Sequence, residues 1–79
     1  MWYLSTFNMP KPFPLKRLLR ILEDKGFFLV SQKGSHAKFK KHGSIILTVI
    51  VPIHGKEVPY GTLRSILRQA NLDERDLIE

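Results

Sequence analysis

Residues 27–51 read FFLVSQKGSHAKFKKHGSIILTVIV, and this stretch decides the fold. It opens with a run of aromatic and β-branched side chains, followed by a two-residue turn signal at Gly34-Ser35. Residues 36–41 then alternate polar and apolar side chains, and a second turn signal at 42–44 precedes the apolar run 45–51. The pattern predicts a three-stranded antiparallel meander.

Helical spacing precedes this stretch. The apolar positions are Leu15, Leu18, Leu19 and Leu22, with Ile21 at the edge of the stripe. This spacing predicts an amphipathic helix, with Pro14 in its first turn and Gly26 just past its end. Lys16, Arg17, Arg20 and Lys25 are on the opposite face, which is expected to be solvated.

A second helix is predicted after the meander. Its apolar positions are Leu63, Ile66, Leu67 and Ala70. Thr62 is the expected N-cap, Asn71 ends the helix, and Asp73 caps a last short turn near Ile78. The order α-β-β-β-α predicts one α+β domain over residues 1–79, in which both helices cover one face of the sheet. Residues 1–14 are expected to be an extended arm, and residues 15–79 the core.

Composition limits the function classes. The 79-residue chain has no cysteine, so disulfides and thiolate metal sites are excluded and a cytoplasmic location is expected. Its apolar runs are too short to span a membrane. The net charge is +6, and residues 11–41 carry nine Lys or Arg against Glu23 and Asp24. Such a basic body suits a polyanion, although a solvated basic surface without a partner is the alternative.

The turn at Gly34-Ser35 assigns side chains to the two faces of the sheet. It places Lys33 opposite His36, Gln32 opposite Ala37 and Val30 opposite Phe39. The face expected beneath the helices comprises Phe28, Val30, Ala37, Phe39, Ile45, Leu47 and Val49. The other face comprises Ser31, Lys33, His36, Lys38, Lys40 and Thr48, together with Leu29, Ile46 and Ile50.

The second face has the residue types needed to act on a phosphate. Lysines hold phosphates as point charges, and histidine is the side chain best suited to proton transfer near neutral pH. If the phosphate belongs to RNA, the adjacent 2′-hydroxyl is an internal nucleophile and no metal is needed. His36 is therefore the candidate catalytic residue, whereas His42 suits a turn and His54 a loop. A surface histidine without catalytic function is the alternative.

Other chemistry finds little support in the sequence. There is no Gly-rich phosphate loop, no nucleophile elbow and no histidine pair at i, i+4 for zinc. Except for Glu57, the carboxylates cluster at Glu23-Asp24 and at the C-terminus, away from the basic face. We therefore expect neither a metal nor a small-molecule cofactor.

Two motifs carry a resemblance to a known family. QKGSHAKF at residues 32–39 and YGTLRSILRQANL at residues 60–72, with VPIHG at 51–55 between them, resemble the HicA toxins of prokaryotic toxin-antitoxin pairs. The resemblance covers residues 9–79. Met9-Pro10-Lys11 is similar to the usual start of the family, so residues 1–8 are expected to be an extension.

The resemblance implies a fold similar to double-stranded-RNA-binding domains and an mRNA interferase activity, an endoribonuclease neutralised by a HicB antitoxin. It also implies that His36, in the Gly-Ser-His motif, is catalytic. We expect Lys33, Lys38 and Lys40 to position phosphates, with Ser31 and Thr48 as lesser candidates. His54, Arg64 and Arg68 are further candidates for RNA or partner contact. The rival functions are an RNA-binding module without catalysis and a protein that meets only an acidic partner.

Overall fold

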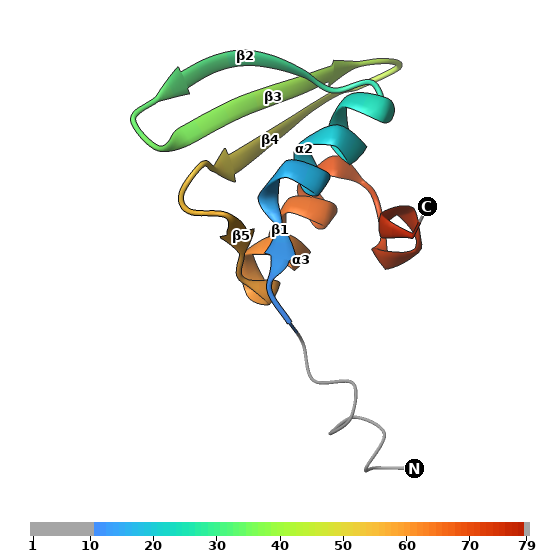
Figure 1. Ribbon diagram of the computed structural model, residues 1–79. Helices are drawn as coiled ribbons and strands as arrows, with labels where there is room; N and C mark the ends of the chain where they lie inside the picture. The colour runs from blue at the N-terminus through green and yellow to red at the C-terminus, as the bar shows by residue number, and fades with distance from the viewer. Residues whose placement is uncertain (1–10, 79) are drawn as a thin grey trace.

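The structure is a computed structural model and describes residues 11–78. In chain order the elements are β1 (Phe13–Pro14), α2 (Leu15–Asp24), β2 (Phe28–Lys33), β3 (His36–His42), β4 (Ile46–Pro52), β5 (Glu57–Val58), α3 (Tyr60–Ala70) and the 3-10 helix η1 (Glu74–Leu77). The strands β2, β3 and β4 form an antiparallel sheet in that order, and both α-helices lie on one side of it (Figure 1). The α+β fold of the double-stranded-RNA-binding-domain-like type is therefore confirmed.

A second, two-stranded sheet was missed by the sequence analysis. Phe13 of β1 lies opposite Val58 of β5, and the Leu15 N–H donates to the Lys56 carbonyl at 2.9 Å. Strands of two residues that contain or adjoin proline show no periodicity, so the pattern predicted an arm and a loop instead. This pairing fixes the start of α2 beside the segment that leads into α3. Residues 1–10 of the predicted arm, including Met9, lie outside the described residues.

The predicted core face of α2 is confirmed for Leu15, Leu18 and Leu22, and Leu18 and Leu22 are 0% exposed. Ile21, expected at the edge of the stripe, is buried, whereas Leu19 is only partly buried. Gly26 follows the helix with φ +98°, a left-handed conformation that glycine adopts without a steric cost. A Cβ there would also lie 3.4 Å from Cε of Lys41. The helix therefore ends where the sequence predicted.

The helix α3 buries Leu63, Ile66, Leu67 and Ala70, as predicted. Its N-cap, however, is Pro59 and not Thr62, because the helix begins at Tyr60 and the Leu63 N–H donates to the Pro59 carbonyl at 2.9 Å. Thr62 lies within the first turn and makes no capping hydrogen bond. Asn71 ends the helix in the left-handed conformation, with φ +58°, as expected.

A side chain of α3 also covers the outer edge of β4. The Ile50 N–H donates to Oε1 of Gln69 at 2.9 Å, and Nε2 of Gln69 contacts Oγ of Ser65 at 3.3 Å. An edge strand leaves alternate N–H groups without a strand partner. Gln69 supplies the missing acceptor for one of them and joins α3 to the sheet.

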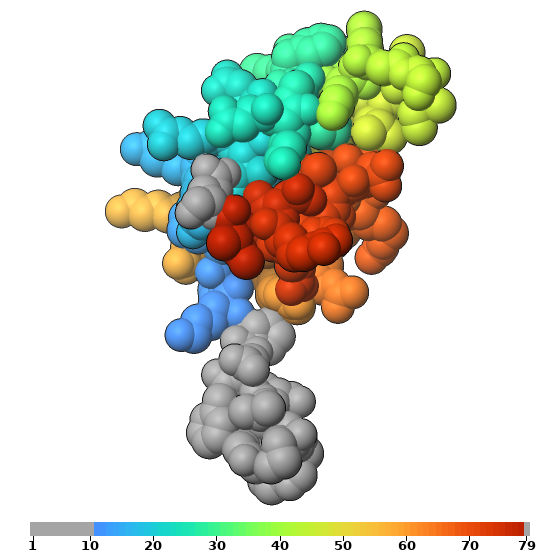
Figure 2. Space-filling view, turned by 90° about the vertical axis from the view of Figure 1, so that its right-hand side faces the viewer, coloured from blue at the N-terminus to red at the C-terminus, as the bar shows by residue number. Residues whose placement is uncertain are grey.

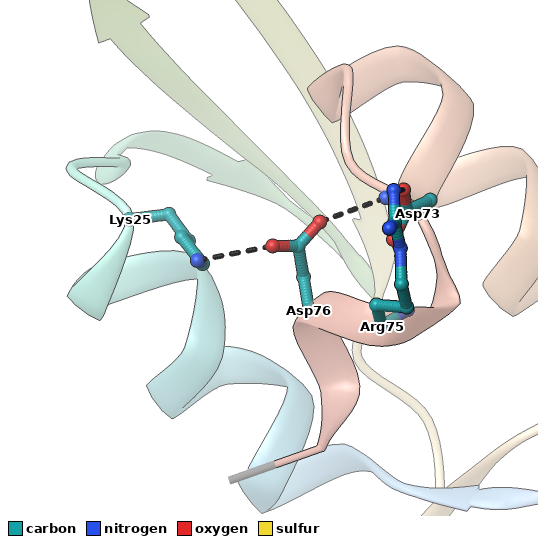
Figure 3. A network of polar contacts seen from close by, with 4 residues as sticks. All are labelled: Lys25, Asp73, Arg75 and Asp76. Atoms are coloured by element: carbon teal, nitrogen blue, oxygen red, sulfur yellow. Dashed lines mark hydrogen bonds and ion pairs between the residues drawn. The ribbon is translucent and has the colours of Figure 1, made fainter.

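The C-terminal turn η1 packs beside α2 (Figure 2). Asp73 caps it, as predicted, and Nζ of Lys25 lies 3.1 Å from Oδ1 of Asp76 (Figure 3). The Asp73 backbone N–H and the Lys25 ammonium both stabilise the Asp76 carboxylate and lower its pKa. Arg17 adds a hydrogen bond to the Leu77 carbonyl at 2.7 Å. These contacts hold the end of the described chain against α2, on the helical side of the molecule.

The register between β2 and β3 contains a bulge. Lys33 lies opposite His36 and Gln32 opposite Ala37, as predicted, but the register shifts between Leu29 and Ser31. Val30 is the extra residue, so the predicted pairing of Val30 with Phe39 is wrong.

The bulge exchanges the faces of the residues before it. Leu29 lies opposite Phe39, on the helical side, and Phe28 lies opposite Lys40, on the far side. The predicted places of Phe28, Val30 and Leu29 are therefore wrong, and Phe28 is 46% exposed. Ile45 was also expected in the core; it is 64% exposed because β4 begins only at Ile46 and Ile45 belongs to the preceding turn.

Candidate nucleic-acid interface

The side of the sheet away from α2 and α3, here called the outer face, is not covered by any of residues 11–78 (Figure 1). His36, Lys38, Lys40 and His42 follow one another at every second position of the central strand β3. Alternate residues of a strand point to the same face and lie roughly 6.7 Å apart. They form one line of side chains along the middle of the outer face, which we call the basic row.

The hairpin turn fixes the position of His36. Gly34 has φ +59°, so it turns the chain in a left-handed conformation. The Ile53 N–H donates to the Ser35 carbonyl at 2.6 Å, and Nε2 of Gln32 donates to the Gly34 carbonyl at 3.2 Å. The turn is thus tied to the segment after β4. His36, the first residue of β3, is held between Lys33 on one side and Pro52 on the other.

A pocket of 360 Å³ lies beside His36. It is lined by Ser31, Gln32, Lys33, His36, Lys38 and Ile50. Four of these residues were predicted as site residues. Gln32 was not, because its pairing with Ala37 placed it on the other face, and Ile50 was noted only as an apolar neighbour. The structure therefore brings the imidazole and two of the three expected lysines to one pocket.

Lys40 and Thr48 lie one step further along the sheet. They are directly opposite each other, and Nζ of Lys40 donates to Oγ1 of Thr48 at 3.2 Å. Both side chains are half-buried. Because the hydrogen bond restrains the flexible lysine, this ammonium has a more defined place on the outer face than a free surface lysine would.

The charged side chains of the outer face are all lysines. Residues 25–56 contain no Asp or Glu, so no carboxylate of the three strands opposes the lysines. Charges in such a cluster attract an anion over several ångströms and repel other cations. Within residues 11–78, no group of three His, Asp or Glu side chains gathers in a way that could hold a metal ion.

The remaining candidates lie apart from His36. His42 is at the far end of the basic row, where its ring meets the ring of Phe28 edge to face with 5.2 Å between centroids. His54 is exposed in the segment between β4 and β5 and does not line the pocket. Arg64 and Arg68 lie on α3, beside a separate cavity of 530 Å³. The structure therefore does not bring His54, Arg64 or Arg68 to the pocket of His36.

The fold and this face define the class of protein as a small α+β domain of the double-stranded-RNA-binding-domain-like type, with one sheet face whose charged side chains are all basic. Within the described residues, no helix is long and apolar enough to cross a membrane. A family model described as the HicA toxin of bacterial toxin-antitoxin matches residues 15–72, from the start of α2 to just after α3. The chain therefore belongs to the HicA toxin family. No curated protein matches it.

Proposed function

We propose that this toxin is an endoribonuclease that cleaves mRNA with His36 as its general acid/base and is neutralised by a HicB-like antitoxin. The observation that carries the proposal is the pocket at the hairpin turn, where His36 lies with Lys33 and Lys38 on a sheet face without carboxylates. Family membership supports the toxin role, and the charge of the outer face supports a polyanionic substrate.

The proposed reaction uses the RNA 2′-hydroxyl as nucleophile. Its oxygen forms a bond to the adjacent phosphorus while the bond from phosphorus to the 5′-oxygen of the next nucleotide breaks. His36 accepts the proton of the 2′-hydroxyl, and the leaving 5′-oxygen is protonated by water or by the same imidazole. The products are a 2′,3′-cyclic phosphate and a 5′-hydroxyl. The proposed reaction uses no atom of a cofactor.

The lysines would neutralise the charge of the phosphate and hold it in position. Negative charge grows on the non-bridging phosphate oxygens in the transition state, so cations placed there in advance stabilise it. Lys33 and Lys38 line the pocket and take this role, and Ser31 is a further donor beside them. Lys40, restrained by Thr48, would hold the next phosphate along β3.

The first experiment compares two histidines of the same strand and face. His36→Ala should lower the rate of RNA cleavage by about 10² to 10⁴, the usual contribution of a placed general acid/base. His42→Ala removes an exposed imidazole six residues further along β3 and should retain most of the activity. Cleavage is followed by gel analysis of end-labelled RNA, and growth arrest on expression gives a second measurement.

Full activity of His36→Ala would contradict the catalytic assignment. Cleavage by the wild type should persist in EDTA, since the proposed reaction needs no metal. If the wild type binds RNA in a salt-sensitive way but yields no products, the chain is a non-catalytic RNA-binding module instead. If the wild type neither binds nor cleaves RNA, the basic face serves an acidic protein partner.

The antitoxin is tested separately. A HicB-like protein encoded beside the toxin should form a complex with the full chain and abolish RNA cleavage in a mixture of the two purified proteins. A complex that leaves cleavage unchanged would contradict the proposed neutralisation.

A further inference from the structure

The outer face contains an aromatic residue that the sequence analysis placed in the core. Phe28 lies opposite Lys40 because of the bulge at Val30, and it is 46% exposed. Its ring meets His42 edge to face, with an interplanar angle of 77°. Exposed apolar side chains of this size are a feature of binding surfaces, because burial in a complex removes them from water.

We propose that Phe28 is a base-stacking residue and that the RNA segment on the outer face is single-stranded. The inference rests on the proposed function, because the occupant is the same RNA that His36 cleaves. It adds a contact to a base, whereas the residues considered so far contact only phosphate and ribose.

Charge and shape together favour this occupant. Phe28 of β2 lies opposite Lys40 of β3, and the Lys40 ammonium is bonded to Thr48 of β4. An aromatic ring for a base and a cation for phosphate therefore lie at the same level of the outer face, on neighbouring strands. Surfaces that bind single strands combine these two features, since every base has a face that can stack. A base within a duplex is already stacked on both sides and offers no free face, so double-stranded RNA would leave Phe28 uncovered.

The spacing along the sheet is suitable for a short RNA segment. The strand from His36 to Lys40 advances four residues, roughly 13 Å at the rise of a β-strand. Phe28 is at the level of Lys40, so it would contact a nucleotide near the scissile phosphate but not the one being cleaved. Phe28 therefore acts on binding and on the choice of cleavage position, and not on the chemical step.

Binding is tested in the His36→Ala chain, which keeps the RNA intact. Fluorescence anisotropy with a short labelled oligouridine gives the affinity of the full-length protein. Adding Phe28→Ala should weaken binding roughly 5- to 150-fold, the usual loss when a stacking aromatic is removed. Phe28→Trp should retain the affinity, which also shows that the effect follows the ring and not a loss of folding.

Leu29→Ala is the matched control. Leu29 is the next residue of β2 and is 54% exposed, but it lies opposite Phe39 on the other face of the sheet. Its removal should leave the affinity for oligouridine unchanged. An oligonucleotide of the same length with abasic positions gives a second control, because Phe28→Ala should have no effect on its binding.

The results that would contradict this inference differ from the result that would contradict the proposed function. The inference is overturned if Phe28→Ala binds oligouridine as tightly as its parent, if the abasic strand shows the same loss, or if the parent binds a duplex more tightly than a single strand. It is also overturned if Phe28→Ala weakens only the complex with the antitoxin, which would make the patch a protein interface. Phe28-dependent binding without cleavage by the wild type would instead refute the ribonuclease proposal and leave the stacking residue in place.

Discussion

Gly34 determines the direction in which His36 enters the sheet, because it is the residue of the hairpin turn with a left-handed backbone. Its φ is +59°, and a Cβ placed there meets nothing within 4 Å. The cost of Gly34→Ala is therefore conformational, about 1 kcal/mol of unfolding free energy. Gly34→Asn should lose less, since asparagine tolerates this conformation better. Urea denaturation of the three proteins measures the difference.

Gly61→Ala is the control for that prediction. Gly61 lies in the first turn of α3, is not in the left-handed region, and also has open space around it. Alanine favours a helix over glycine, so this variant should be as stable as the wild type or more stable. Equal losses at both positions would show that the turn conformation is not the cause.

The residues of the candidate site were partly predictable from the sequence. A two-residue turn leaves only one choice for the strand positions beside it, which is why Lys33, His36 and Lys38 were placed correctly on the outer face. Phe28 was placed wrongly because residues 27–30 are all apolar and their pattern does not distinguish the two faces. Only the hydrogen-bond register shows that Val30 is an extra residue.

Among the elements, α3 and β4 are joined by the side chain of Gln69. Gln69→Leu removes the acceptor of the Ile50 N–H and should lower the free energy of unfolding by about 0.5 to 1.5 kcal/mol. Gln69→Glu keeps an acceptor oxygen at the same distance along the side chain and should stay near the wild-type value. Chemical denaturation, with hydrogen exchange of the Ile50 amide as a local readout, checks both. Leucine and glutamate variants of equal stability would contradict the role of this bond.

Longer elements were predicted better than short ones. The apolar stripes of α2 and α3 span several turns, so most of their buried residues could be identified from spacing alone; the exception is the exchange of Leu19 and Ile21 at the edge of the α2 stripe. The strands β1 and β5 have two residues each, and their pairing depends on the tertiary fold rather than on local pattern. Thr62 was mistaken for an N-cap for a related reason, because Pro59 already ends the preceding segment and the helix begins before the first periodic apolar residue.

For the whole molecule, the distribution of charge predicts how RNA binding depends on salt. Each phosphate neutralised on a single strand contributes roughly −0.7 to the slope of log affinity against log salt concentration. If Lys33, Lys38 and Lys40 all contact phosphates, the slope has a contribution of about −2 from them. Lys38→Gln should make the slope less steep by about 0.7, measured by anisotropy in the His36→Ala chain.

Lys16→Gln provides the comparison at equal net charge. Lys16 is exposed on α2 and does not line the pocket of His36. Lys16→Gln should leave the slope unchanged, although it lowers the net charge of +6 by the same amount as Lys38→Gln. If both variants made the slope less steep to the same extent, RNA binding would depend on the total charge of the protein and not on the outer face.

The bulge at Val30 also affects how two copies of this chain can associate through their sheets. β2 is an outer strand of its sheet, and Leu29 and Val30 are exposed there. A regular apolar edge strand is a template on which a second copy can add its own strand and start an aggregate. At Val30 the even spacing of backbone groups is interrupted, and Lys33 adds a charge near the end of the strand. On the opposite edge of the sheet, the Ile50 N–H already donates to Gln69, so this amide is not free to pair with another strand. The bulge that places Phe28 on the outer face thus also hinders a second copy of the chain from adding a strand to this sheet.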